Sequence, residues 1–174
     1  MGCTYSDIKF DNPDLQIASF VSEEEVKLVV DSWTILRDDT YVGLHIFNRF
    51  FQMHPEFKKL FTEQMTVEDN DLLVDEEKLR HHGNIVMEGL GAAVESLDDS
   101  VFLSNVLVTM GESHARHNVK PEMVILLWPA IRDAFNGCLG TDFTTQMATA
   151  WEHVFEYMAT KFKEGLRKET KHAR

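Results

Sequence analysis

The stretch Arg80-His81-His82-Gly83-Asn84-Ile85-Val86 decides how this chain is interpreted, together with the stretch Met110-Gly111-Glu112-Ser113-His114. Around each stretch, apolar residues recur at steps of three and four, which predicts an amphipathic helix with a histidine on its apolar face. The apolar positions that share a face with His82 are Leu79, Val86, Leu90, Ala93 and Leu97. Those in register with His114 are Leu103, Leu107 and Met110.

Two histidines on the apolar faces of two helices fit an iron porphyrin held between those helices. A neutral imidazole offers a nitrogen lone pair that binds iron axially, and apolar neighbours shelter the porphyrin from water. The same pattern also fits two structural histidines buried against hydrogen-bond partners, which is the commoner reason for a histidine on an apolar face. The pattern alone leaves both interpretations open.

The neighbouring histidines are weaker candidates. His81 is turned by about 100° from the Val86 face, because a helix has 3.6 residues per turn. His117 follows His114 by three residues, and it is either a rival ligand, a contact of the heme edge or a solvated residue at a helix end. We expect ordinary surface or packing roles for the others, which are His45, His54, His153 and His172.

Composition indicates one compact domain. The chain has 174 residues, 44% of them hydrophobic, which is enough to bury a core without disulfides. It has two cysteines, one of them Cys3, so we expect a reducing, intracellular setting. A formal net charge of -12 argues against nucleic acid as a partner. No apolar run approaches the roughly twenty residues that span a bilayer, and no signal-peptide core is present.

The periodicity predicts an all-α fold, with no strand-like alternation of useful length. Ser22 and Glu25 form a capping box at the start of the first helix. The buried positions predicted for that helix are Val26, Val29, Val30, Trp33 and Leu36. A second helix runs from about Thr40 to the His54-Pro55 step.

Three later segments complete the helical prediction. The acidic stretch Glu63 to Glu77 is expected to be a solvated connector with one short helix at most. Pro121 suits the first turn of the penultimate helix, and Pro129 inside that helix predicts a kink. A long last helix carries Met147, Trp151, Val154, Met158 and Phe162.

These residues together resemble the globin family. The stretch 80–86, followed by Ala92-Ala93-Val94, is similar to the globin distal helix, in which glycine follows the histidine and valine comes four residues after it. Other segments match in order and spacing: Trp33, then Phe47, Pro55 and Phe61, then Met110 to His114, and then Asn136-Gly137-Cys138-Leu139-Gly140. The resemblance covers about residues 22–168, and the chain looks closer to neuroglobin and the membrane-bound globin X group than to myoglobin-like oxygen stores.

The resemblance implies a globin fold of about eight helices around a heme pocket. It implies a globin domain at 22–168, a flexible N-terminal leader at 1–21 and a C-terminal tail at 169–174. The resemblance also implies heme b (iron protoporphyrin IX) as the cofactor. The residues that the resemblance assigns to the heme are His114 (proximal), His82 (distal), Phe47, Phe61 and Val86.

The same resemblance implies a six-coordinate iron bound by both histidines, and binding of oxygen, carbon monoxide, nitric oxide or nitrite. A redox, nitrite-reducing or sensing role follows, with a reductase as a possible partner. The position that is lysine in neuroglobin is Ile85 here, so a propionate contact does not carry over. The alternatives are a soluble oxygen-storage or oxygen-transport globin and a heme-free helical interaction module.

The amino terminus, Met1-Gly2-Cys3-Thr4-Tyr5-Ser6, fits the N-myristoylation pattern, with Gly2 as acceptor and Cys3 as a palmitoylation site. A single myristoyl chain binds membranes only marginally, so a second signal is needed. Residues 1–25 hold one basic residue, Lys9, so the second signal is acylation of Cys3 rather than a polybasic patch. Globin X proteins have a similar Gly-Cys start. We therefore expect lipid anchoring to the cytoplasmic side of a membrane, with an unmodified leader in the cytoplasm as the alternative.

Overall fold

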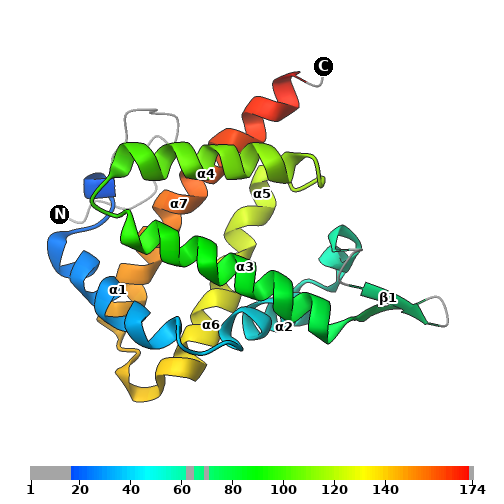
Figure 1. The fold of residues 1–174 in the computed structure, drawn as a ribbon, viewed down its shortest axis with the longest axis horizontal. Helices are drawn as coiled ribbons and strands as arrows, with labels where there is room; N and C mark the ends of the chain where they lie inside the picture. Colours follow the sequence, from blue (N-terminus) through cyan, green and yellow to red (C-terminus); the bar gives the residue numbers. More distant parts are fainter. Residues whose placement is uncertain (1–16, 62–64, 69–70, 173–174) are drawn as a thin grey trace, which may run out of the picture.

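Seven α-helices, short 3₁₀ helices and one β-hairpin make up the described part of the computed structural model, which covers residues 17–61, 65–68 and 71–172 (Figure 1). The α-helices are α1 (Glu23–Leu36), α2 (Val42–Met53), α3 (Glu76–Glu95), α4 (Ser100–Ala115), α5 (Pro121–Val124), α6 (Trp128–Leu139) and α7 (Thr145–His172). The 3₁₀ helices are Ile17–Ser19, Pro55–Leu60, Ile125–Leu127 and Gly140–Asp142. The predicted all-α class is confirmed, with the hairpin as the exception.

Side chains cap the helices that frame the core. The capping box of α1 is present: the Glu25 backbone N–H donates to Ser22 Oγ at 3.3 Å, and the Ser22 N–H donates to Glu25 Oε2 at 2.9 Å. Asp75 accepts from the Lys78 N–H at the start of α3, and Asp99 accepts from the Phe102 N–H at the start of α4. Each cap satisfies a backbone donor that has no partner within its helix.

The predicted buried face of α1 is correct at three positions and wrong at one. Val29, Trp33 and Leu36 are buried, and Val26 is half-buried. Val30 is 41% exposed, because the step from Val29 turns it by about 100° toward solvent.

The prediction for the acidic connector was wrong. The segment contains an antiparallel hairpin, β1 (Met65–Glu68) and β2 (Asp71–Val74), instead of a short helix. Met65 pairs with Val74 and is 6% exposed, whereas Val67 is 72% exposed. Met65 and Val67 lie on the same face of the strand, so burial is confined to the end of the hairpin next to α3, where Met65 pairs with Val74. Figure 1 shows the hairpin projecting from the helices.

Near Pro129, where a kink was predicted, a 3₁₀ turn interrupts the helix. The helix that begins at Pro121 stops after Val124, continues as the 3₁₀ turn Ile125–Leu127, and restarts as α6 at Trp128. Pro129 therefore lies in the first turn of α6, where its missing N–H removes no helical hydrogen bond.

The described chain joins the core before the first α-helix. Ile17, Phe20 and Val21 are buried, so packing begins ahead of the predicted start at Ser22. At the other end α7 continues to His172. The predicted domain limits remain predictions. In the described residues, no helix combines the length and the apolar character that crossing a membrane requires.

Helices α1 and α7 are joined by two polar contacts. The Trp151 indole N–H donates to Ser32 Oγ at 2.9 Å, and both residues are buried. Two turns closer to the start of α1, Glu25 Oε1 lies 2.8 Å from His153 Nδ1. Glu25 thus caps α1 and fixes it to α7 at once.

The first prediction concerns Glu25. Burial alone raises the pKa of its carboxyl, but the hydrogen bond from the Ser22 N–H and the charge of His153 outweigh it and hold the pKa below 4.5. A lowered pKa in the folded state stabilises the fold above the unfolded pKa, and this contribution is lost as pH falls through the folded value. Glu25→Gln should therefore lower the free energy of unfolding by about 1 kcal/mol near neutral pH, with a difference that shrinks below about pH 4.

Urea unfolding near neutral pH and below about pH 4 measures the difference in the free energy of unfolding between Glu25→Gln and the unsubstituted protein. Glu24→Gln is the matched control, because Glu24 is an exposed carboxylate of the same turn. An equal loss of stability for Glu25→Gln at both pH values would contradict the assigned role of its charge.

Candidate functional site

The two predicted histidines lie on helices that are supported by different partners. His82 is on α3, which packs against α2, and His114 is on α4, which packs mainly against α7. Helices α3 and α4 make few contacts with each other. They approach at Gly89, where a Cβ atom would lie 3.7 Å from Met110 Cε. Figure 1 shows α4 crossing one end of the molecule, with α3 beside it.

His82 lies in a cluster of aromatic rings. Its ring centroid is 5.0 Å from that of Phe47 and 5.6 Å from that of Phe61, and the two phenylalanine rings are 5.4 Å apart. Phe47 is buried, and His82 and Phe61 are half-buried. Val86, one turn farther along α3, is half-buried against the same core. The structure therefore brings together the predicted residues of the distal side.

The hydrogen bonding of His114 leaves one ring nitrogen available. His114 Nδ1 lies 2.8 Å from the Met110 carbonyl oxygen, one turn earlier in α4. Because a carbonyl only accepts, Nδ1 carries the hydrogen, and in the neutral ring Nε2 keeps its lone pair. The ring of Phe162 on α7 lies against the imidazole, with 5.0 Å between centroids. His114 is thus fixed in the tautomer that binds a metal through Nε2.

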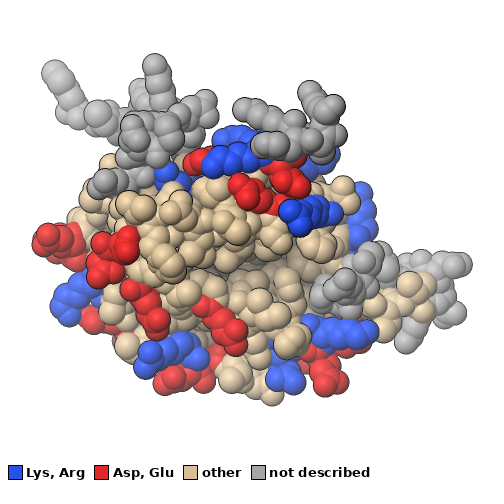
Figure 2. Space-filling view, turned by 45° about the horizontal axis from the view of Figure 1, so that its top comes forward, with Lys and Arg blue, Asp and Glu red and all other residues tan. Residues whose placement is uncertain are grey.

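These residues fit a heme. Two imidazoles among aromatic and apolar side chains are a donor set found around heme iron. Figure 2, which turns the α4 end of Figure 1 toward the viewer, shows a largely uncharged face that is hollowed near its centre, with most charged residues around it. The aromatic neighbours of both histidines suit a porphyrin better than a hydrated ion.

A glycine contact holds each histidine-bearing helix against its supporting helix. Gly83, next to His82, lies so close to α2 that a Cβ there would be 2.6 Å from the Gly43 carbonyl carbon. Gly111, three residues before His114, faces Gly165 of α7, and a Cβ on Gly111 would be 3.1 Å from the Gly165 Cα and closer still to the Phe162 carbonyl oxygen. Both crossings admit only glycine at these distances.

The other predicted positions are farther from this arrangement or have other partners. His81 and His117 are exposed, and so is His45. His54 lies against the rings of Phe50 and Phe57, and His153 pairs with Glu25. Gly2 and Cys3 lie outside the described residues.

Sequence reasoning missed several contributors to the site. Phe51 completes the distal cluster, with its centroid 4.9 Å from that of Phe61, and Phe162 contacts the proximal candidate. The sequence does not predict either Phe51 or Phe162 to lie at the heme site. Gly43 and Gly165 also went unnoticed, although glycine inside a long helix is itself a signal of close packing.

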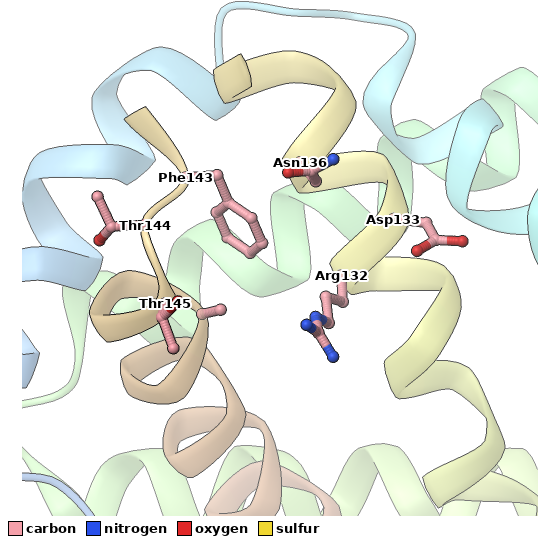
Figure 3. Close-up of a pocket in the computed structure, with 7 residues that line it drawn as sticks. Arg132, Asp133, Asn136, Phe143, Thr144 and Thr145 are labelled. Carbon is pink, nitrogen blue, oxygen red and sulfur yellow. The ribbon is translucent and has the colours of Figure 1, made fainter. Parts of the chain in front are cut away.

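A separate pocket of about 230 Å³ lies at the corner between α6 and α7 (Figure 3). Figure 3 shows Arg132 and Asp133 on α6, with Phe143 in the connection and Thr145 at the start of α7. Asp133 also pairs with Arg49, with Nε and Oδ2 2.7 Å apart. Neither histidine lines this polar pocket, so it is not the candidate heme site.

The fold defines an all-α protein with two candidate heme ligands, His82 and His114. The chain belongs to the globin family, because the globin family model matches residues 44–162. Its relatives include cytoglobin-1 of Oryzias latipes, 29% identical over 82% of each chain. They also include neuroglobin of Danio rerio, 26% identical over 87% of this chain and 96% of that one.

A solved structure shows the same fold. The crystal structure of a hexacoordinated heme protein from an anhydrobiotic tardigrade at pH 4 matches with a TM-score of 0.76 and 19% identity. The match covers 84% of this chain and 96% of that chain. The predicted globin family and fold are thereby confirmed.

The second prediction follows from the glycine crossing beside His82. Gly43→Ala places a methyl group against the Gly83 backbone, which cannot move aside as a side chain can. The free energy of unfolding should fall by about 2 to 3 kcal/mol, the usual cost of overpacking.

The matched control is Gly137→Ala in α6, where no atom lies within 4 Å of the added Cβ. This variant should gain about 0.5 to 1 kcal/mol, because alanine favours a helix interior. Urea unfolding of both full-length variants measures the contrast. A Gly43→Ala chain as stable as the unsubstituted one would refute the close crossing.

Proposed function

We propose that this chain is a membrane-anchored globin whose heme iron is bound by both His114 and His82, with a redox, nitrite-reducing or sensing role. The observation that carries the proposal is the pair of supported imidazoles on α3 and α4, each beside an aromatic side chain from another segment. The cofactor is proposed to be heme b. When bound, it supplies an iron that exchanges electrons and binds diatomic gases.

His114 is proposed as the proximal ligand. Its Nδ1–H donates to the Met110 carbonyl, which fixes the ring and increases the basicity of Nε2. The Phe162 ring restricts the imidazole from the side of α7. This side chain enters the bound state with little reorganisation.

His82 is proposed as the distal residue and as an iron ligand in the resting state. Phe47 and Phe61 restrict its ring and exclude water on the distal side. An external gas would then compete with the His82 imidazole. Its observed affinity would be the intrinsic affinity multiplied by the fraction of protein in which the site is open. The hexacoordination of the tardigrade heme protein with the same fold supports this assignment.

The third prediction tests the proximal assignment. His114→Ala removes the imidazole that Met110 orients, so the purified variant should lose stable heme incorporation or change its absorbance spectrum drastically. Heme content and the visible spectrum measure the effect. His117→Ala is the control, because His117 is exposed beyond the end of α4. Unchanged heme content and an unchanged spectrum in His114→Ala would exclude this residue as the proximal ligand.

The fourth prediction tests the distal assignment and separates this proposal from an oxygen-storage globin. Without gas, the ferrous protein should give the sharp, split visible bands of a six-coordinate, low-spin heme. His82→Leu should convert it to a five-coordinate heme that binds carbon monoxide faster, because no internal ligand has to leave first. His81→Leu is the control on the adjacent exposed position. The same spectrum and binding rate in His82→Leu as in the unsubstituted protein would mean that His82 does not ligate the iron.

Lipid on Gly2 and Cys3 is proposed to hold the protein at the cytoplasmic side of a membrane. The pattern Gly2 to Ser6 supports myristoylation, and Cys3 offers the second acyl site that stable attachment needs. Fixed at a membrane, the protein suits local chemistry better than bulk oxygen transport. Nitrite reduction there requires a one-electron donor, for which a reductase is the proposed partner.

The fifth prediction concerns this anchor. Gly2→Ala should release the chain entirely, because myristoylation requires that glycine and palmitoylation of Cys3 usually follows it. Cys3→Ser should leave weak attachment, because one acyl chain binds membranes with an association constant on the order of 10⁴ M⁻¹. Fractionation of animal cells measures both, and Cys138→Ser is the control for loss of a thiol. An unsubstituted protein found wholly in the cytosol would overturn the anchor.

A further inference from the structure

Two adjacent apolar side chains at the start of α4 face solvent. Val101 is 69% exposed and Phe102 is 55% exposed. Single exposed apolar residues are ordinary, but a contiguous apolar patch commonly marks a contact surface. The backbone here is fixed, because the Phe102 N–H donates to Asp99 Oδ1 at 3.0 Å. Both side chains therefore project from a defined helix start.

This helix start lies beside the place where the described chain begins. The ring of Phe20 packs edge-on against that of Tyr157, with 5.5 Å between centroids. The Tyr157 hydroxyl donates to the carbonyl oxygen of Ser100, the residue before Val101, at 3.2 Å. Figure 1 likewise shows the first described helix, Ile17–Ser19, next to the start of α4.

The length of the leader connects this patch to the proposed anchor. Fourteen residues lie between Gly2 and Ile17, and the fifteen steps from one to the other can span at most about 54 Å. Acyl chains on Gly2 and Cys3 would therefore keep the start of α4 within reach of the bilayer. A weak contact becomes effective under such a tether, because its binding is then intramolecular.

We propose that Val101 and Phe102 form a lipid-contacting tip that inserts into the membrane interface and orients the anchored protein. The proposal rests on the anchoring proposed above. An aliphatic and an aromatic side chain at the end of a helix suit the boundary between headgroups and acyl chains. The tip is too small to bind a membrane by itself and acts once the acyl anchor holds the chain nearby.

The charges around the tip determine the kind of lipid surface that it suits. Asp98 and Asp99 precede α4 directly, and both are exposed. Anionic headgroups repel these carboxylates, so the tip should gain nothing from them. The contact is hydrophobic, with a neutral lipid interface as its partner.

Vesicle binding tests the proposal with the full-length, heme-loaded chain, made with and without N-myristoylation. The probes are phosphatidylcholine vesicles, alone and with phosphatidylserine added. The test variant is Val101→Ser with Phe102→Ser. The control is Val67→Ser with Leu73→Ser, because these side chains are 72% and 42% exposed on the hairpin, which Figure 1 shows at the opposite side of the molecule from the helix Ile17–Ser19.

The myristoylated protein should bind phosphatidylcholine vesicles, and the tip variant should bind about tenfold more weakly. A tenfold loss corresponds to the free energy of burying fewer than about two methylene groups in the membrane. The hairpin control should bind as the unsubstituted protein does, and phosphatidylserine should not strengthen binding. Equal binding of the tip variant, or an equal loss in the hairpin control, would overturn the tip and leave the anchor standing. A myristoylated protein that binds no better than the unmodified one would overturn both.

Hydrogen exchange gives a second readout that needs no substitution. With vesicles present, the myristoylated chain should gain amide protection at residues 101–103 and none at the hairpin strands, Met65–Glu68 and Asp71–Val74. Vesicle-bound protein without added protection at 101–103 would refute the tip.

Discussion

Close approach of helix backbones at two glycine pairs is the constraint on which the rest of the structure depends. Gly43 with Gly83 brings α2 against α3, and Gly111 with Gly165 brings α4 against α7. Because backbone atoms fill both crossings, each helix is held in a fixed rotation about its own axis as well as at a fixed distance. The first crossing sets the direction in which α3 presents His82, and the second sets the direction in which α4 presents His114. The orientation of both imidazoles is therefore a property of the helix packing.

The two sides of the site are restrained in different ways. His114 has a directional hydrogen bond to its own helix, which selects one tautomer. His82 lies against the rings of Phe47 and Phe61, which come from other segments of the chain. Part of the restraint on His114 therefore comes from its own helix, whereas the aromatic contacts of His82 come from α2 and from the segment after it.

Much of this arrangement could be predicted from local sequence signals. The Ser22 capping box, the apolar faces of α3 and α4 and the first-turn position of Pro121 all follow from short-range rules, and the structure bears them out. The errors arose where local and tertiary effects compete. The many carboxylates of the connector indicated a solvated segment although Met65 is buried, and Pro129 indicated a kink where the structure has a 3₁₀ turn between α5 and α6. The glycine crossings need knowledge of which helices meet, and no single sequence provides it.

The projecting hairpin gives the molecule an uneven distribution of local stability. Its two strands pair only with each other in the described residues, and they make few contacts with the helices beyond the burial of Met65. A two-stranded hairpin is marginally stable in water, so this segment opens at a free energy well below that of global unfolding. It also precedes α3 directly, seven residues before His82 when counted from Asp75. The segment that opens most easily thus lies directly before α3, and its opening leaves the glycine-packed crossing of α3 with α2 in place.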